Sequence, residues 1–162
     1  MIKNPWIEDF PQIKEDSIYL DTAATSLKPN VVIDSINHYY NDLSSNIHRG
    51  MYEAAIESTE LYEETREVVA RFINAEPDSI VYTRGTTSSL NLVAFSYGLN
   101  HLHEGDEIIV SELEHHSSFL PWQVVAKRTG AVLKFVELNK EGRITVDAFK
   151  HALSDKTKIV AL

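Results

Sequence analysis

The sequence predicts an α/β fold with a largely parallel sheet. From about residue 79 onward, short apolar runs of strand length alternate with stretches whose apolar residues recur at helical spacing. Strands that alternate with helices of this length imply right-handed crossovers and parallel pairing. The first half has mainly helical periodicity. We therefore expect an N-terminal strand and helical segment, residues 1–75, followed by the first part of a larger sheet domain, residues 76–162.

The composition is that of a globular protein with a real core. Hydrophobic residues make up 43% of the 162 residues, and 15 basic against 24 acidic residues give a net charge of −9. This balance argues against nucleic acid and anionic membranes as partners. The chain has no cysteine, so it holds no disulfide framework, thiolate metal site or cysteine nucleophile. No apolar run approaches the ~20 residues of a membrane span, and MIKNPWIEDF lacks a signal-peptide core, so we expect a cytoplasmic protein.

The N-terminal segment is predicted to contain one strand and two amphipathic helices. The strand covers residues 18–21 and leads into the loop TAATSLKPN. The first helix follows a Pro-Asn start signal, and its apolar residues recur three and four apart: Val32, Ile36, Tyr39, Tyr40 and Leu43. The second covers residues 52–74, with Glu67 and Arg71 paired across one exposed turn. Its buried stripe is predicted to comprise Leu61, Val68, Val69 and Phe72.

Strands and helices alternate in the second half. The strands are expected at residues 79–83, 107–113, 131–138 and 158–162. The first intervening helix is expected to stop at Gly98, the second at Thr129-Gly130, and the third to be capped by Thr145. The chain stops inside the apolar run KIVAL, and a domain rarely ends on an uncovered edge strand. We therefore expect residues 1–162 to be an incomplete fold.

Arg84-Gly85-Thr86-Thr87 follows a predicted strand and opens a predicted helix. Gly85 permits a tight turn, and the hydroxyl and N–H groups of Thr86 and Thr87 would lie at the positive end of the helix, which favours a phosphate. The segment matches neither a Walker loop nor a G-x-G-x-x-G turn, which disfavours a nucleotide-binding module. Taken alone, a hydroxyl-rich helix cap without a ligand is the commoner use of such a segment.

A second candidate, Glu114-His115-His116-Ser117, also follows a strand. Ligands of α/β sheets gather at the carboxyl ends of the strands. A histidine there can stack on an aromatic cofactor or move a proton near neutral pH, or simply lie in a solvated loop. A metal site that also uses His101 or His103 lacks the H-E-x-x-H spacing, and we expect no metal.

Two further loops carry weaker signals. Asn46-Ile47-His48-Arg49-Gly50 is a polar break between helices, and an arginine beside a glycine suits a carboxylate or phosphate. A surface loop is the commoner explanation. In Asp21-Thr22-Ala23-Ala24, the small residues would allow a ligand to approach the backbone.

In this order, the four segments resemble the class V aminotransferase family, and within it the cysteine desulfurases of iron–sulfur cluster assembly and the selenocysteine lyases. The resembling segments are YLDTAAT at 19–25, NIHRG at 46–50, RGTT with LNLVA at 90–94, and EHHSSFLPWQ at 114–123. The resemblance covers nearly the whole chain. It implies the N-terminal portion of a fold-type I transferase that depends on pyridoxal 5′-phosphate.

The resemblance also implies roles for single residues. Thr86 and Thr87 match the residues that hold the cofactor phosphate, and His115 matches the histidine that stacks on the pyridine ring and assists proton transfer. At the two next positions, Ser88 and Ser89, many relatives have Glu and Gly.

The substrate-side residues are implied in the same way. Ala23 and Ala24 match a loop near the substrate, and His48 and Arg49 match a loop at the mouth of the active site. The implied substrate is cysteine or selenocysteine, with a sulfur-acceptor protein as a further partner and a homodimer as the expected assembly of the full-length form.

In the family pattern, the lysine that forms a Schiff base with the cofactor and the nucleophilic cysteine lie beyond Leu162. We therefore expect the chain alone to be inactive. Two alternatives remain open: another class V enzyme, such as an epimerase or a kynureninase-like hydrolase, and a non-catalytic remnant with a structural role.

Overall fold

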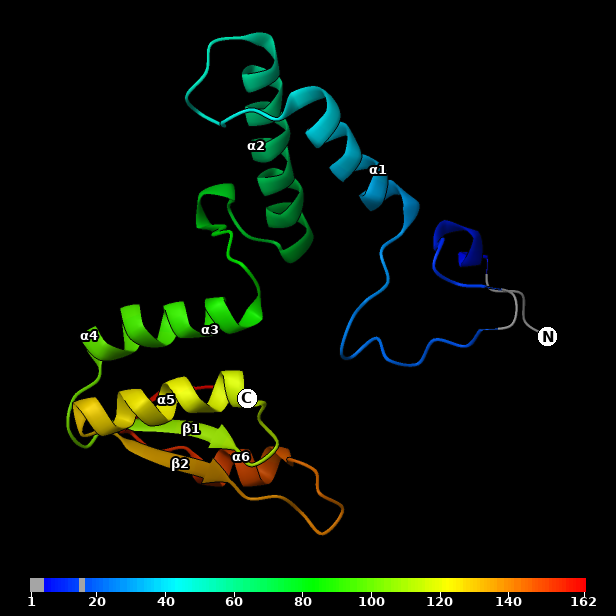
Figure 1. Ribbon diagram of the computed structural model, residues 1–162. Coiled ribbons are helices and arrows are strands. Elements are labelled where there is room, and N and C mark those ends of the chain that lie inside the picture. Colours follow the sequence, from blue (N-terminus) through cyan, green and yellow to red (C-terminus); the bar gives the residue numbers. More distant parts are fainter. Residues whose placement is uncertain (1–4, 15–16) are drawn as a thin grey trace. The chain divides into compact units, whose positions relative to one another are not determined.

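The computed structural model describes residues 5–14 and 17–162. The chain forms two compact units, Met1–Ile80 and Val81–Leu162 (Figure 1). The described residues of the first unit form helices and no strand, and the second unit contains the sheet.

Unit 1 is built around two helices. Pro29 precedes the first helix, which ends at Ser44, a residue with a left-handed backbone (φ 31°). The second helix ends at Asn74, which is also left-handed (φ 55°). The elements are the 3-10 helix η1 (Ile7–Asp9), α1 (Asn30–His38), the π-helical turn η2 (Tyr39–Leu43) that continues it, α2 (Glu53–Ile73) and the 3-10 helix η3 (Pro77–Ser79). Both predicted helices are therefore present.

Three of the four residues of the apolar stripe predicted on α2 are exposed, and the fourth, Val69, is half-buried. Leu61, Val68 and Phe72 are 44%, 49% and 90% exposed, while the buried residues of α2 are small: Ala55, Ser58 and Ala70. The prediction was wrong because periodicity identifies the apolar face of a helix but not what covers it. The predicted pairing of Glu67 with Arg71 is also absent among the described residues. Arg66 instead pairs with Glu63, with 2.8 Å between Nε and Oε2.

Unit 2 has the predicted α/β architecture. Its elements are α3 (Thr86–Val93), the π-helical turn η4 (Ala94–Gly98), α4 (Leu99–His101), β1 (Glu107–Ser111), α5 (His116–Thr129), β2 (Val132–Val136), α6 (Val146–Ala152) and β3 (Thr157–Val160). The three strands are parallel, in the order β2-β1-β3. The α/β class and the parallel sheet are confirmed.

The central strand β1 separates two apolar cores, and Figure 1 shows α5 and α6 over its opposite sides. Side chains alternate across a strand, so Ile108 and Val110 pack with Trp122 and Val125 of α5. Ile109 lies in the second cluster, whose other buried members are Val136 and Ala152. Helices thus cover both faces of the sheet, as parallel sheets require.

Two predicted strands are absent. Residues 18–21 and 80–83 lie outside any strand, and Pro77–Ser79 forms η3. Ile18, Leu20 and Val81 are exposed. A strand needs a neighbouring strand to pair with, and among the described residues neither segment pairs with one. The helix predicted to stop at Gly98 continues to His101, because Gly98 has helical backbone angles.

Local end signals agree with the structure. Thr145 caps α6, its Oγ1 accepting from the N–H of Ala148, and Gly130 ends α5 in the left-handed region (φ 78°).

At the start of β1, Glu107 Oε2 accepts from Ser154 Oγ (2.6 Å) and Lys134 Nζ (3.0 Å). The hydrogen bond from Ser154, and then that from Lys134, lower the pKa of Glu107.

Candidate functional site

The N-terminal end of α3 is open. Its N-cap residue, Gly85, has φ 146°, a conformation that favours glycine, and no side chain caps the helix. A Cβ built on Gly85 would meet no atom within 4 Å. The first N–H groups of a helix lack partners within it. This end therefore offers N–H groups and the positive end of the helix dipole to an anion.

Hydroxyl groups brace the turn that leads into α3. Thr83 Oγ1 accepts from the N–H of Gly85 (3.4 Å) and lies 2.7 Å from Ser89 Oγ. Ser89 N–H donates to the carbonyl of Gly85 (3.1 Å). Ser89 thus fastens the first turn of the helix to the preceding loop. This role could not be predicted from the residue types alone.

His115 lies at the carboxyl end of β1, where α5 begins. The connection is held by Ser111, whose Oγ donates to Glu114 Oε1 (2.8 Å) and accepts from Leu113 N–H (3.2 Å). His115 is the N-cap of α5, and its ring accepts from the N–H of Ser117. An exposed imidazole is thereby fixed at the sheet edge where α/β proteins bind ligands.

The structure brings Thr87 and His115 together. Both line an open groove of about 380 Å³ between α3 and the start of α5, with six further residues: Asn91, Phe95, His116, Ser117, Leu120 and Pro121. Thr86 adjoins the groove through the chain but does not line it.

Asn91 and Phe95 were not singled out from the sequence, and Ser117 was named only as part of the candidate segment at 114–117, without a role of its own. Thr87, Asn91 and Phe95 are spaced by four, so they share one helix face, and Asn91 Nδ2 donates to the carbonyl of Thr87 (2.8 Å). That spacing was the available signal.

The four predicted substrate residues lie in unit 1, whereas Thr86, Thr87 and His115 lie in unit 2. His48 has a left-handed backbone (φ 61°), its N–H donates to Thr59 Oγ1 (3.0 Å), and its Nε2 lies 3.2 Å from Glu63 Oε1. Arg49 is exposed. Ala23 and Ala24 form an exposed turn.

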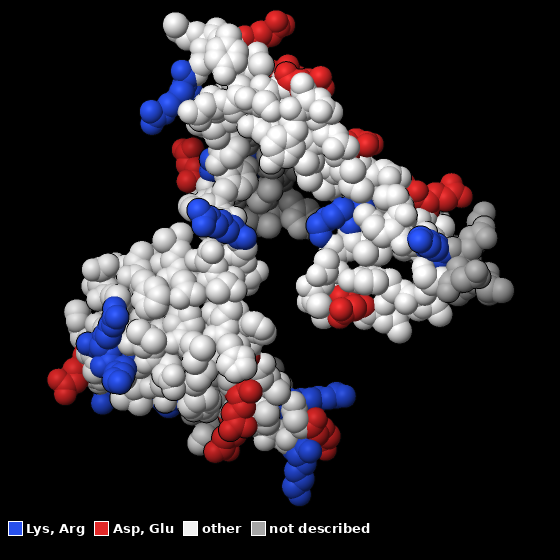
Figure 2. Space-filling model, in the orientation of Figure 1, with Lys and Arg blue, Asp and Glu red and all other residues white. Residues whose placement is uncertain are grey.

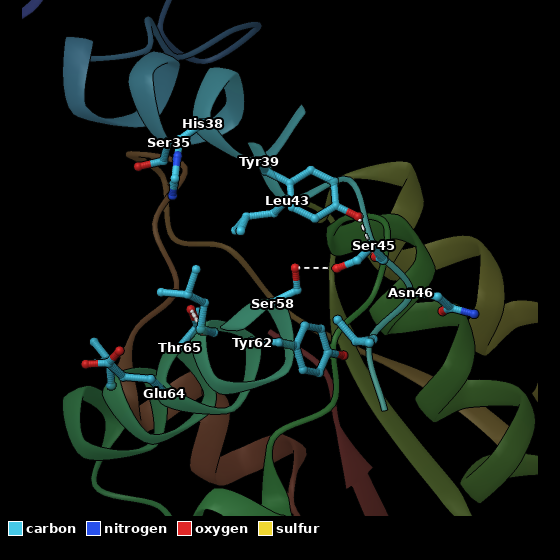
Figure 3. Close-up of a pocket in the computed structure, with 13 residues that line it drawn as sticks. Ser35, His38, Tyr39, Leu43, Ser45, Asn46, Ser58, Tyr62, Glu64 and Thr65 are labelled. Atoms are coloured by element: carbon cyan, nitrogen blue, oxygen red, sulfur yellow. Dashed lines mark hydrogen bonds between the residues drawn. The ribbon is translucent and has the colours of Figure 1, made fainter. Parts of the chain in front are cut away.

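A cavity of about 710 Å³ lies in unit 1 between α1, η2 and α2 (Figure 3). Ser45 Oγ and Ser58 Oγ are 2.7 Å apart at its wall, and Tyr39 donates its hydroxyl to the carbonyl of Ser45 (3.0 Å). Leu61 and Val68, from the stripe expected to be buried, line this cavity. Asn46 and Ile47 of the candidate segment at 46–50 also line it, whereas none of the residues given a predicted role does: Ala23, Ala24, His48, Arg49, Thr86, Thr87 and His115.

Other ligand classes find little support. Within residues 5–14 and 17–162, no cluster of three or more His, Cys, Asp or Glu residues could hold a metal ion, and His101 stacks on Tyr97 instead. On the face shown in Figure 2, basic side chains are dispersed among acidic ones. Across the described part of the chain, the helices are too short or too polar to cross a membrane. Residues 1–4, part of the N-terminus expected to lack a signal peptide, lie outside the described residues.

Comparisons with known proteins agree on one family. The family model for class-V aminotransferases matches residues 18–162. A probable cysteine desulfurase of Synechocystis sp. is 47% identical over 161 residues, which are 96% of this chain and 38% of the relative. Another, from Halalkalibacterium halodurans, is 49% identical over 146 residues, with 90% and 36% covered. The chain thus spans well under half the length of these relatives.

Solved structures give the same result. The apo cysteine desulfurase of Thermococcus onnurineus has a TM-score of 0.83 at 39% identity, over 88% of this chain and 35% of that one. The cysteine desulfurase CsdA of Escherichia coli also has a TM-score of 0.83 at 39% identity, over 99% and 41%. The predicted fold-type I architecture and the resemblance to cysteine desulfurases are confirmed. The chain belongs to the class-V aminotransferase family.

Proposed function

We propose that this chain carries the phosphate-binding and ring-stacking residues of a pyridoxal 5′-phosphate-dependent cysteine desulfurase. The observation that carries the proposal is the convergence of Thr87 and His115 on one groove, beside the open first turn of α3. The two desulfurase relatives at 47% and 49% identity support the same assignment.

The donors present fit a phosphate monoester. Unpartnered N–H groups at the first turn of α3, with the hydroxyl groups of Thr86 and Thr87, would hold its oxygens. Among the described residues, no side chain caps this end of α3, and a phosphate can approach because Gly85 has no Cβ and open space around it. When bound, pyridoxal 5′-phosphate supplies an electron sink for the amino-acid substrate.

His115 is placed for two tasks. Its imidazole lines the groove beside Thr87, so it can stack on the ring of a cofactor whose phosphate lies at α3. A histidine can also take up and return a proton near neutral pH. Both tasks need a fixed ring, and the N-cap position supplies it.

The substrate-side assignments extend the proposal. In unit 1, the exposed guanidinium of Arg49 suits the carboxylate of cysteine or selenocysteine, and His48, Ala23 and Ala24 would complete the approach to the active site. The whole enzyme would pass persulfide sulfur to an acceptor protein, for example in iron–sulfur cluster assembly. We expect a cytoplasmic homodimer for the full-length protein.

The chain alone is proposed to be inactive. It contains no cysteine, and none of its lysines stands in the family's Ser-x-His-Lys setting. Sulfide and alanine formation from cysteine by the purified chain would contradict this.

Binding of pyridoxamine 5′-phosphate tests the cofactor site, because this amine form cannot react with surface lysines. We expect saturable binding to the 162-residue chain, measured by ligand fluorescence. Thr86→Val and Thr87→Val should each weaken it about tenfold, because a hydrogen bond to a charged group contributes about 1.5–3 kcal/mol.

Two controls separate a specific site from general attraction. Pyridoxamine, which lacks the phosphate, should bind much more weakly to the parent chain. Thr65→Val removes a hydroxyl that only bonds the carbonyl of Leu61 in α2, and should leave binding unchanged. Equal affinities for the parent and both Thr86 and Thr87 variants would sink the assignment.

A further inference from the structure

The imidazole of His115 is held by two donors from one residue. Ser117 N–H donates to His115 Nδ1 at 3.2 Å, and Ser117 Oγ lies 2.8 Å from the same nitrogen. The backbone N–H can only donate, so Nδ1 must accept and cannot carry a proton. The hydroxyl of Ser117 then donates to Nδ1 as well.

We propose that Ser117 is a positioning residue that fixes His115 as the neutral tautomer with its proton on Nε2. The proposal deepens the cofactor role proposed for His115 and rests on it for its functional meaning. If Nδ1 carried the proton, Ser117 N–H would point at another donor. The N–H would then have no acceptor, because the first turn of a helix offers none to its own N–H groups. The start of α5 therefore selects one tautomer.

The tautomer decides which nitrogen can do chemistry. Nδ1 has its lone pair occupied by Ser117, so it cannot receive a proton without breaking the cap of α5. Nε2 has no hydrogen bond within the described residues, since the other contact of the ring is an edge-on contact with His116 at 6.1 Å between centroids. Any proton that His115 gives to or takes from a ligand in the groove therefore moves at Nε2.

Nuclear magnetic resonance of the imidazole nitrogens tests this in the 162-residue chain without any cofactor. Spectra recorded at about pH 8 distinguish the two neutral tautomers by the chemical shifts of Nδ1 and Nε2. The signals of His115 are identified by their loss in His115→Gln. We expect the parent to show Nε2 protonated and Nδ1 unprotonated.

Two variants of Ser117 remove the donors in steps. Ser117→Pro removes both, and proline is tolerated in the first turn of a helix. It should lower the ratio of the Nε2–H to the Nδ1–H tautomer about fivefold, the factor contributed by one ordinary hydrogen bond. Ser117→Ala keeps the N–H and should give a smaller change, and Ser117→Thr should restore the parent ratio.

Ser118→Pro is the matched control, because it removes an N–H that bonds the carbonyl of His115 (2.8 Å) and not its ring. Its tautomer ratio should equal that of the parent. A proton on Nδ1 in the parent overturns the proposal, and so does an unchanged ratio in Ser117→Pro. If Ser117→Pro fails to fold, the parent and Ser117→Ala spectra decide. If the parent chain shows the Nε2–H tautomer but does not bind pyridoxamine 5′-phosphate, the result would contradict the proposed function and leave the tautomer proposal standing.

Discussion

Gly50 closes the NIHRG segment, and its replacement by alanine tests how this loop is tied to α2. A Cβ at position 50 would overlap the Cβ of Ala55 and lie 2.7 Å from Cε1 of Tyr52. The ring of Tyr52 can rotate away. Ala55 is fully buried and its Cβ is fixed to the backbone of α2, so either the loop or the first turn of α2 must move.

The magnitude follows from two opposing effects. Adding a methyl group to a closely packed position costs about 1–3 kcal/mol. Replacing glycine by alanine restricts the unfolded chain and returns about 0.4–1 kcal/mol. We expect Gly50→Ala to lower the free energy of unfolding by about 1.5 kcal/mol. With a urea m-value of about 1–3 kcal/mol/M, the midpoint should fall by roughly 1 M.

Urea unfolding followed by circular dichroism measures this change, with Gly98→Ala as comparison. The same methyl group at position 98 would lie 3.0 Å from Trp122 Cζ3 and 3.1 Å from Val125 Cγ1, a milder crowding. It also gains about 1 kcal/mol of helix propensity, so its effect should be close to zero. A Gly50→Ala midpoint at or above that of the parent, or a larger loss in Gly98→Ala, would refute the reasoning.

Two pH-dependent stabilities are also expected. The hydrogen bonds from Ser154 and Lys134 lower the pKa of Glu107, so their stabilisation is present above the ordinary value of 4.5 and is lost as pH falls through the lowered pKa. Glu107→Gln should remove this dependence from acid unfolding curves. The hydrogen bond to Asp42 raises the pKa of His38. The stabilisation by this hydrogen bond is present below the ordinary histidine pKa of 6.5 and is lost as pH rises through the raised pKa. Asp42→Asn should therefore lower the titration midpoint of His38 measured by nuclear magnetic resonance.

The sequence was most informative where the structural cause is local. Thr145 as the cap of α6 and Gly130 as the end of α5 could be read directly, because each acts within one helical turn. The strands β1, β2 and β3 were also placed correctly, since their partners lie in the same unit.

The failures concern partners that a periodic pattern does not specify. Residues 18–21 have the composition of a strand, yet without a neighbour they remain outside any strand. Phe72 stands in the apolar stripe of α2 and is 90% exposed. In both cases the pattern gives the preference of the segment, while the contact that would satisfy it depends on residues far away in the sequence.

The candidate site shows the same division. Thr86, Thr87 and His115 could be proposed from the sequence because phosphate binding at a helix start and a histidine after a strand are local arrangements. The roles of Ser117 and Asn91 could not be predicted because they depend on the direction of a hydrogen bond. Nothing in the residue types alone shows that Ser117 donates to the ring of His115.

The width of the groove depends on a hydrophobic cluster that contains none of the predicted site residues. Gly98 in η4 has no side chain, and this lets the helical stretch that begins with Thr86 approach Trp122 and Val125 of α5. The same two residues pack on Ile108 and Val110 of β1. The helix that carries Thr87 and the helix that begins after His115 are thus fastened to each other and to the sheet by one cluster. The spacing of the two groups across the groove is therefore set by core packing, so substitutions that loosen this cluster should weaken cofactor binding even when Thr87 and His115 are intact.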